Sequence, residues 1–355
     1  MTSEKNSSVT NEKNSNKPVK AGLLSFGMSG KLFHAPFVAT SDHFEFVAVV
    51  ERSKKAAQQF YPNVISYNTV DELLANPEIE LVIVNTPNNT HFEFTKQAIE
   101  AGKDVLVEKP FVPTANEART LFDLARKLGR KILVYQNRRW NSDFYSVRDV
   151  IESNRIGELV EMHIRFDRFR LQIGPKAFKE TPLPGSGIGY DLGSHIIDQV
   201  ISLFGKPEKA LKIGTKNRPL TQVEDYVCFV LSYGKGPQIY ITTSYLAAES
   251  STAYVLHGTR GSFRKERSDV QENQLNEGMS PLHPDFGRES DADEGMLTYH
   301  DLSGEMLTEN IPGRSSNFSD LFDLVYQNIR NNQPYPITED QVIAQLEILE
   351  QPFWN

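Results

Sequence analysis

Residues 21–33, AGLLSFGMSGKLF, decide the fold of this chain. An apolar run leads into a loop, and a helix is expected from about Lys31. The loop consists of Ser25, Phe26, Gly27, Met28, Ser29 and Gly30, a G-x-G-x-x-G pattern with Ser25 at the first glycine position. Between a strand and a helix, the second glycine lets the backbone approach a pyrophosphate, the third lets the helix pack closely, and the helix N-terminus supplies donors. The stretch favours a dinucleotide-binding loop at residues 26–30 over a bare structural turn.

The segment around this loop alternates strands and helices. Short apolar runs lie at residues 21–25, 45–50, 81–86, 104–109 and 131–136, and helical stretches such as 90–101 and 115–128 separate them. Continuous apolar runs of this length are typical of strands that are buried on both faces of a parallel sheet. Residues 19–137 are therefore predicted to form a doubly wound α/β domain of the Rossmann type.

The rest of the chain has a different pattern. A helix at about residues 143–153 leads into alternating strands at 159–168, 225–233, 238–245 and 253–258, with another helix at 194–204. This pattern predicts an α+β domain with an open, mostly antiparallel sheet at residues 138–355, suited to substrate binding and oligomerisation. Residues 265–295 are expected to form a long loop, and the polar residues 1–18 a disordered tail.

Composition narrows the class of function. The chain has 355 residues, a net charge of −8 and no basic stripe, which disfavours nucleic acid as a partner. One cysteine cannot form an intrachain disulfide, and neither a cysteine pair nor a His-x-x-x-His element is present to bind a metal. No apolar run reaches the roughly 18 residues of a membrane span or signal peptide, so we expect a cytoplasmic protein that acts on a small molecule.

The end of the second predicted strand bears on which dinucleotide is bound. Glu51 is suited to accept hydrogen bonds from the ribose hydroxyls of NAD, whereas Arg52, with Ser53 and Lys54 beside it, is suited to the 2′-phosphate of NADP. Basic residues simply solvated at a strand end are the alternative. The sequence leaves NAD or NADP open, with a slight preference for NADP.

Two further motifs carry a family resemblance. Glu108-Lys109-Pro110 ends a predicted strand at the carboxyl edge of the sheet, and Asp191 and His195 stand four residues apart at the start of a predicted helix. With Gly27 and Gly30, these motifs resemble the Gfo/Idh/MocA oxidoreductases over residues 19–347. Several blocks resemble the scyllo-inositol dehydrogenase-like branch of that family: residues 33–36, 86–91, 136–140, 166–170 and 184–191.

The resemblance implies a catalytic set and further cofactor contacts. Lys109, Asp191 and His195 match the family's catalytic residues. A histidine near neutral pKa is suited to accept the hydroxyl proton and a lysine to stabilise the alkoxide, although the division of proton transfer between them stays open. The residues expected along the dinucleotide are Thr86, Pro87, Asn88, His91, Glu108, Lys109 and Gln136.

Charged residues beside apolar ones complete the predicted site. Arg138, Asp167, Arg168, Tyr190 and His195 are candidate substrate contacts. Buried charges must be paired or bind ligand, so a salt-bridge network that includes Arg139 is an equal alternative to substrate contact for the charged members.

The expected function is hydride transfer between NAD(P) and a secondary alcohol or ketone of a polyol or sugar, inositol-like. A non-catalytic dinucleotide-binding regulator and a biliverdin- or dihydrodiol-type reductase are the alternatives. A homodimer or homotetramer is expected, with Tyr240, Tyr245 and Tyr254 on an exposed sheet face. Pro352 would break the last helix, so the terminus is expected to be truncated or divergent from the family.

Overall fold

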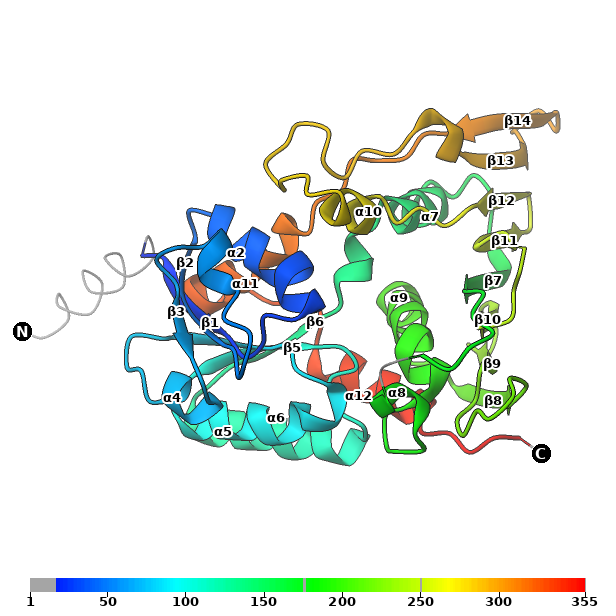
Figure 1. Cartoon of the computed structure of the whole chain (residues 1–355). Coiled ribbons are helices and arrows are strands. Elements are labelled where there is room, and N and C mark those ends of the chain that lie inside the picture. The colour runs from blue at the N-terminus through cyan, green and yellow to red at the C-terminus, as the bar shows by residue number, and fades with distance from the viewer. Residues whose placement is uncertain (1–16, 175–176, 250, 355) are drawn as a thin grey trace, which may run out of the picture.

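Two sheets organise the chain. The computed structural model describes residues 17–174, 177–249 and 251–354. Residues 1–16 of the expected disordered tail lie outside the described residues. A parallel six-stranded sheet forms the N-terminal half, and a mostly antiparallel eight-stranded sheet lies across the molecule from it within these residues (Figure 1). Both predicted fold classes are therefore confirmed.

The parallel sheet has the strand order β3-β2-β1-β4-β5-β6, and every neighbouring pair runs parallel. All four residues of β4 are buried, as expected for a strand covered on both faces. Helices α4, α5 and α6 lie along one face of the sheet and α2 and α11 along the other (Figure 1). The strands are β1 (Val19–Leu23), β2 (Phe44–Val50), β3 (Ile65–Tyr67), β4 (Leu81–Val84), β5 (Asp104–Glu108) and β6 (Ile132–Tyr135). The helices are α2 (Ala35–Thr40), α3 (Ala57–Phe60), α4 (Val70–Leu74), α5 (His91–Glu100), α6 (Ala115–Leu128) and α11 (Ser319–Asn331).

Local signals explain why α6 begins and ends where it does. The Thr114 hydroxyl accepts a hydrogen bond from the Glu117 amide, and the Glu117 carboxylate accepts one from the Thr114 amide, which is a complete capping box. Gly129 ends the helix with a φ of 63°, a left-handed conformation that glycine adopts without strain. The predicted bounds of this helix, residues 115–128, are therefore confirmed.

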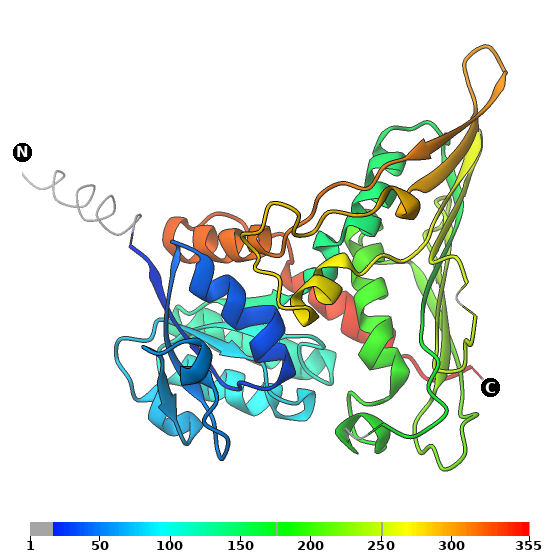
Figure 2. The same cartoon turned by 45° about the horizontal axis from the view of Figure 1, so that its top comes forward.

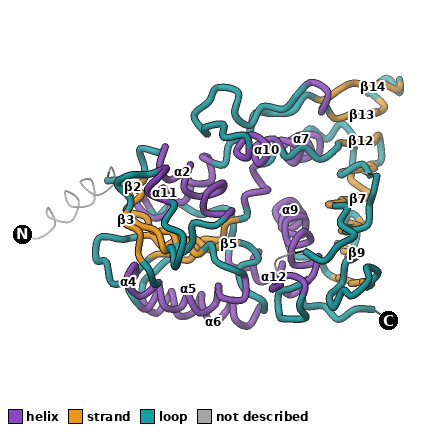
Figure 3. Tube along the Cα trace, in the orientation of Figure 1, coloured by secondary structure: helices purple, strands orange, loops and turns teal. Residues whose placement is uncertain are grey.

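The second sheet has the order β14-β13-β12-β11-β7-β10-β9-β8, and β7 and β10 run parallel. Helix α9 lies between this sheet and the first half of the molecule (Figure 3). The strands are β7 (Leu159–Asp167), β8 (Lys209–Thr215), β9 (Tyr226–Ser232), β10 (Gln238–Ser244), β11 (Tyr254–Gly258), β12 (Gly261–Lys265), β13 (Gly295–His300) and β14 (Met306–Ile311). The helices are α7 (Ser142–Glu152), α8 (Ala177–Glu180), α9 (Ser194–Phe204), α10 (Val270–Asn276) and α12 (Glu339–Leu349).

Two expectations about this half are wrong. The expected loop at residues 265–295 contains helix α10, whose Gln271 side chain is buried and donates to the Trp140 carbonyl. The three tyrosines do not share an exposed face either. Tyr240 is half-buried, while Tyr245 and Tyr254 are 5% and 0% exposed, because strand alternation turns both toward residues 189–204, where they donate hydrogen bonds to Asp191 and Gln199.

The last helices return to the first half of the molecule. Arg330 of α11 donates to Glu80 and to the carbonyls of Lys17 and Pro18, and α12 packs between α6 and α9. Beyond α12, Phe353 forms a parallel bridge with Lys212 of β8. The β13–β14 hairpin projects from the other end of the sheet (Figure 2). No helix among the described residues is long and apolar enough to span a membrane.

Candidate active site

The loop after β1 is shaped to admit a dinucleotide. A Cβ atom on Gly30 would lie 2.3 Å from the Ser25 carbonyl oxygen, so only glycine allows the helix to pack this closely on the strand. A Cβ atom on Gly27 would meet only the Ser25 hydroxyl within 4 Å, which leaves open space beside the backbone. Ser25 replaces the usual glycine by using its Oγ to accept from the Gly27 amide at 3.2 Å. The loop therefore fits a pyrophosphate group.

Glu51 is occupied within its own loop. Its carboxylate is buried and accepts hydrogen bonds from the amides of Ala56 and Ala57 and from the Ser66 hydroxyl at 2.8 Å. The neighbouring Arg52 is exposed, and its guanidinium has no hydrogen bond or ion pair among the residues that the structure describes. The sequence offers Glu51 and Arg52 as rival ribose contacts. In the part of the chain that the structure describes, Glu51 is already hydrogen-bonded, whereas the Arg52 guanidinium is free to bind a ligand.

A cavity of about 940 Å³ lies between the carboxyl edge of the parallel sheet and α9, within the size range of ligand sites. The predicted site residues that line it are Met28, Ser29, Thr86, Pro87, Asn88, His91, Glu108, Lys109, Arg138, Arg168, Tyr190, Asp191 and His195. The predicted residues outside its lining are Phe26, Gly27, Gly30, Glu51, Arg52, Gln136 and Asp167.

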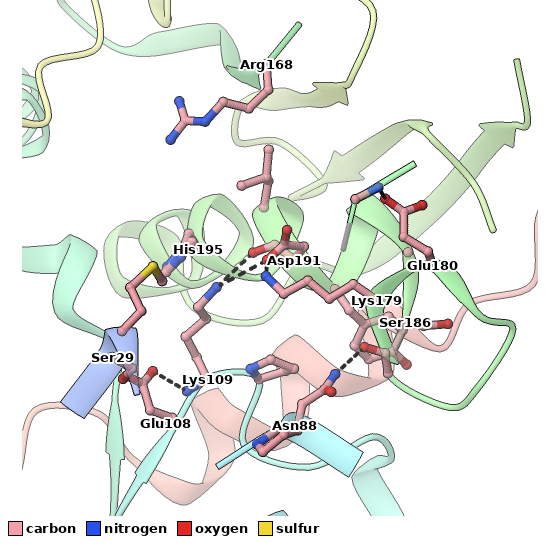
Figure 4. A pocket seen from close by; sticks show the side chains of 18 of the residues that line it. Ser29, Asn88, Glu108, Lys109, Arg168, Lys179, Glu180, Ser186, Asp191 and His195 are labelled. Atoms are coloured by element: carbon pink, nitrogen blue, oxygen red, sulfur yellow. Dashed lines mark hydrogen bonds and ion pairs between the residues drawn. The ribbon is translucent and has the colours of Figure 1, made fainter. Parts of the chain in front are cut away.

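Lys109 and Asp191 meet at the centre of this cavity (Figure 4). The Lys109 ammonium donates to the Asp191 carbonyl oxygen at 2.9 Å and lies 3.9 Å from its Oδ1. Burial lowers the pKa of Lys109 from 10.5 to about 8. Burial alone would raise the pKa of Asp191, but the charges of Lys179 and Lys109 hold it below its usual 3.8. Asp191 therefore stays ionised.

His195 lies one helical turn after Asp191 and faces the same cavity. Its side chain is buried, and Nδ1 has no hydrogen-bond partner among the described residues. Burial, followed by the positive charges of Lys109 and Arg138, lowers the pKa of His195 well below 6.5. The imidazole is therefore neutral at pH 7 and able to accept a proton.

Glu108 joins the phosphate loop to the strand that carries Lys109. It accepts from the Ser29 hydroxyl at 2.5 Å and contacts His34 Nε2 at 2.8 Å. Burial alone would raise the pKa of Glu108, but His34 and Ser29 lower it to about 2. This carboxylate is consequently an anion that fixes the loop beside the cavity.

The loop after β4 contacts both halves of the molecule. Asn88 donates from its side-chain amide to the Gly185 carbonyl at 2.5 Å. His91 is buried with its ring nitrogens 2.9 Å from the carbonyl oxygens of Pro110 and Thr86. Tyr190 donates to the Pro113 carbonyl at 3.0 Å. Asn88 and Tyr190 therefore hold the two sides of the cavity together, whereas His91 fixes the loop within the first half, and all three line the cavity.

Some of the charged candidate residues form salt bridges, and some line the cavity. Arg139 forms two hydrogen bonds, of 2.7 and 2.6 Å, with buried Asp198, so it ties the chain before α7 to α9. Arg138 lines the cavity and is paired with Asp269 and Glu272. Asp167 accepts from Arg165 at 2.8 Å, and strand alternation puts it on the sheet face opposite Phe166. The structure does not place Asp167 at the cavity.

Lys179 and Tyr245 were missed by the sequence interpretation. Lys179 forms an ion pair with Asp191, and the Tyr245 hydroxyl donates to Asp191 Oδ2 at 2.9 Å. Lys179 lies in α8, a helix of four residues that is too short to show periodicity, and Tyr245 directly follows β10. Neither residue has a motif spacing that could have indicated its place beside Asp191.

Family models match both halves of the chain. Residues 19–136 match the model "Oxidoreductase family, NAD-binding Rossmann fold", and residues 144–264 match the "GFO/IDH/MocA C-terminal domain". An uncharacterized oxidoreductase of Schizosaccharomyces pombe is 38% identical over 94% of this chain and 96% of its own length.

Two other relatives extend over nearly the whole chain. The scyllo-inositol 2-dehydrogenase (NADP(+)) IolW of Bacillus subtilis is 31% identical over 94% of this chain and 92% of its own. The crystal structure of an oxidoreductase from Bacillus cereus is 32% identical, with a TM-score of 0.86 over 94% of this chain and 95% of that one. The chain is therefore an NAD(P)-binding oxidoreductase and belongs to the Gfo/Idh/MocA family.

Proposed function

We propose that this protein oxidises a secondary alcohol of a polyol or sugar, or reduces the matching ketone, with NADP as the hydride carrier. The observation that carries the proposal is the meeting of partly buried Lys109, ionised Asp191 and neutral His195 at one cavity beside the phosphate loop. An inositol dehydrogenase among the relatives supports the class of substrate.

The protein's own groups supply the proton chemistry. A bound nicotinamide would supply the acceptor for the hydride that leaves the carbinol carbon. His195 accepts the hydroxyl proton, because its lowered pKa leaves the imidazole neutral and a nitrogen lone pair free at pH 7. Lys109 stays protonated and donates to the developing alkoxide, while Asp191 holds the ammonium in place. His195 is buried and Lys109 and Asp191 are partly buried, which strengthens these interactions.

The direct test is nucleotide reduction with a panel of inositols and hexoses, each with NADP⁺ and with NAD⁺, and ketone reduction with the reduced cofactors. We expect turnover with at least one polyol or sugar. A wild-type protein that is silent on the whole panel in both directions, yet binds NADP⁺, would instead support a dinucleotide-binding regulator.

NADP is preferred because Glu51 is unavailable. Its oxygens already accept from the Ala56 and Ala57 amides and from the Ser66 hydroxyl of β3, and its side chain is buried away from a ribose. The exposed guanidinium of Arg52 next to it is suited to a 2′-phosphate.

Arg52→Ala is expected to raise the KM for NADP⁺ roughly 10-fold or more, with little change for NAD⁺. The lost contact is a charge-assisted hydrogen bond to the 2′-phosphate, which NAD lacks. Arg130→Ala is the matched control, because Arg130 is also exposed but donates to the Gly102 carbonyl at the amino end of the sheet. Equal effects on both nucleotides would contradict the assignment of NADP.

The pH dependence of alcohol oxidation follows from the two shifted groups. His195 must be neutral, which holds above its lowered pKa, and Lys109 must be protonated, which holds below about 8. We expect kcat/KM to be highest near pH 7, to reach about half that value near pH 8 and to fall further above it as Lys109 deprotonates. Initial rates between pH 6 and 10 measure this. A rate that instead rises through pH 8 would assign the role of proton acceptor to Lys109.

A further inference from the structure

Two arginines on the sheet side of the cavity have no role in the chemistry above. Arg168 and Arg170 both line the cavity, on the stretch that continues β7. Their backbone amides donate to the carbonyls of Ser244 and Tyr245, so the stretch is fixed along the end of β10. Side chains two residues apart on an extended chain point to the same side. Figure 4 shows Arg168 reaching over the cavity from the side opposite Ser29 and Glu108.

Aromatic rings support both guanidinium groups. The Arg168 guanidinium lies 4.7 Å from the centroid of the Phe166 ring, and that of Arg170 lies 5.7 Å from the Tyr245 ring. A guanidinium that stacks on a ring keeps its hydrogen-bonding edge free. Each is therefore held in place without using its N–H donors.

The carboxylates around the cavity are already engaged by other groups. Glu108 binds Ser29 and His34, Asp191 binds Lys179 and Tyr245, Glu180 binds Arg218, and Glu272 binds Arg138. Neither Arg168 nor Arg170 has a side-chain hydrogen bond or ion pair within residues 17–174, 177–249 and 251–354. Two cations with free donors thus face a cavity that contains no unengaged anion of the described chain.

The state of Arg168 strengthens this observation. Burial lowers the pKa of Arg168 and the positive charge of Arg138 acts in the same direction, whereas the carboxylates of Asp269 and Glu272, which are themselves paired with Arg138, act against it. A partly buried cation without a partner is unfavourable, and a ligand oxygen with negative charge would relieve it.

We propose that the substrate carries an anionic oxygen group, a carboxylate or a phosphate, which Arg168 and Arg170 bind while its secondary alcohol faces Lys109 and His195. This inference rests on the proposed function, because it uses the alcohol's position to orient the substrate. The predicted ligand class is an acidic or phosphorylated polyol or sugar. The dinucleotide is not the source of this anion, because its phosphate loop lies on the opposite side of the cavity.

The test compares ligands that share a ring and differ in charge. With NADP⁺, kcat/KM is measured for glucose, glucuronate and glucose 6-phosphate, and for myo-inositol and inositol 1-phosphate. We expect the anionic members to exceed the neutral ones roughly 10- to 100-fold, mostly through KM. Preference for glucuronate identifies a carboxylate, and preference for a phosphate ester identifies a phosphate.

Substitutions test whether Arg168 and Arg170 cause the preference for anionic over neutral ligands. Arg168→Gln and Arg170→Gln are expected to remove most of the advantage of the anionic ligands over the neutral ones, whereas Arg168→Lys retains part of it. Arg264→Gln is the control, since Arg264 is exposed on β12 and outside the cavity lining. Thermal denaturation verifies that each variant is folded.

Equilibrium binding separates this inference from the proposed function. The same ligands are titrated calorimetrically into the protein with NADP⁺. Tighter binding of anionic ligands that depends on Arg168 supports the inference even if no nucleotide is reduced, in which case the proposed function fails alone. Equal affinity and equal kcat/KM for neutral and anionic partners, or a preference that survives both Gln substitutions, overturns the inference and leaves the proposed function standing.

Discussion

His195→Asn is expected to lower kcat for alcohol oxidation by roughly 10² to 10⁴, the range for loss of a positioned proton acceptor. Asparagine is smaller but polar, so it preserves most of the packing against Phe166, whose ring lies 6.1 Å from the imidazole. Because the missing group acts on the reacting proton, kcat should fall while the KM for NADP⁺ stays near that of the wild type.

The matched control for this substitution is His163→Asn. His163 lies on the outer face of β7, where its side chain is 42% exposed and contacts Glu161. We expect wild-type rates from this variant, measured as initial rates of NADPH formation. A His195→Asn variant that keeps more than about half of the wild-type kcat would remove His195 from the chemistry.

Lys109→Met is expected to lower kcat by roughly 10² to 10³, comparable with the loss of one donor to a developing oxyanion. Methionine fills a similar volume without a charge, so the cavity should keep its shape. The loss should extend across the pH range, and the fall in rate above pH 8 should disappear, because Lys109 is the group with a pKa of about 8.

Lys127→Met is the control for the lysine substitution. Lys127 is exposed in the last turn of α6, outside the cavity lining, so its replacement should leave both kcat and KM unchanged. If Lys109→Met retains the fall above pH 8, that fall belongs to another group, and the assignment of Lys109 as the alkoxide donor is wrong.

Strong local signals are what made parts of the fold predictable. Helix α6 has a capping box at Thr114 and a glycine stop at Gly129, and β4 is a continuous apolar run, so both follow from nearest neighbours in sequence. Strand β3 has only three residues, and the exposed and half-buried residues of β14 alternate without an apolar stripe. Their pairing is fixed by the strands beside them, which sequence periodicity does not reveal.

The site was predictable to the extent that it uses motifs. Lys109, Asp191 and His195 belong to recognisable blocks, and the structure brings them to one cavity. The engagement of Glu51 depends on Ser66, which lies on β3, and on amides five and six residues further along its own loop. The free donors of Arg168 depend on every nearby carboxylate having another partner. The partners of Glu51 and the absence of a partner for Arg168 among the described residues depend on contacts between residues that only the fold brings together, so the sequence spacing does not reveal them.

Transfer of deuterium is the most direct measurement of the proposed reaction. The best substrate of the polyol and sugar panel, labelled with deuterium at its carbinol carbon, is incubated with the protein and NADP⁺, and the nucleotide is analysed by mass spectrometry. We predict that NADPH gains one mass unit from the label with wild type and that Lys109→Met forms it at a rate lower by roughly 10² or more. Unlabelled NADPH, or no reduced nucleotide with any member of the panel, would contradict hydride transfer at this site.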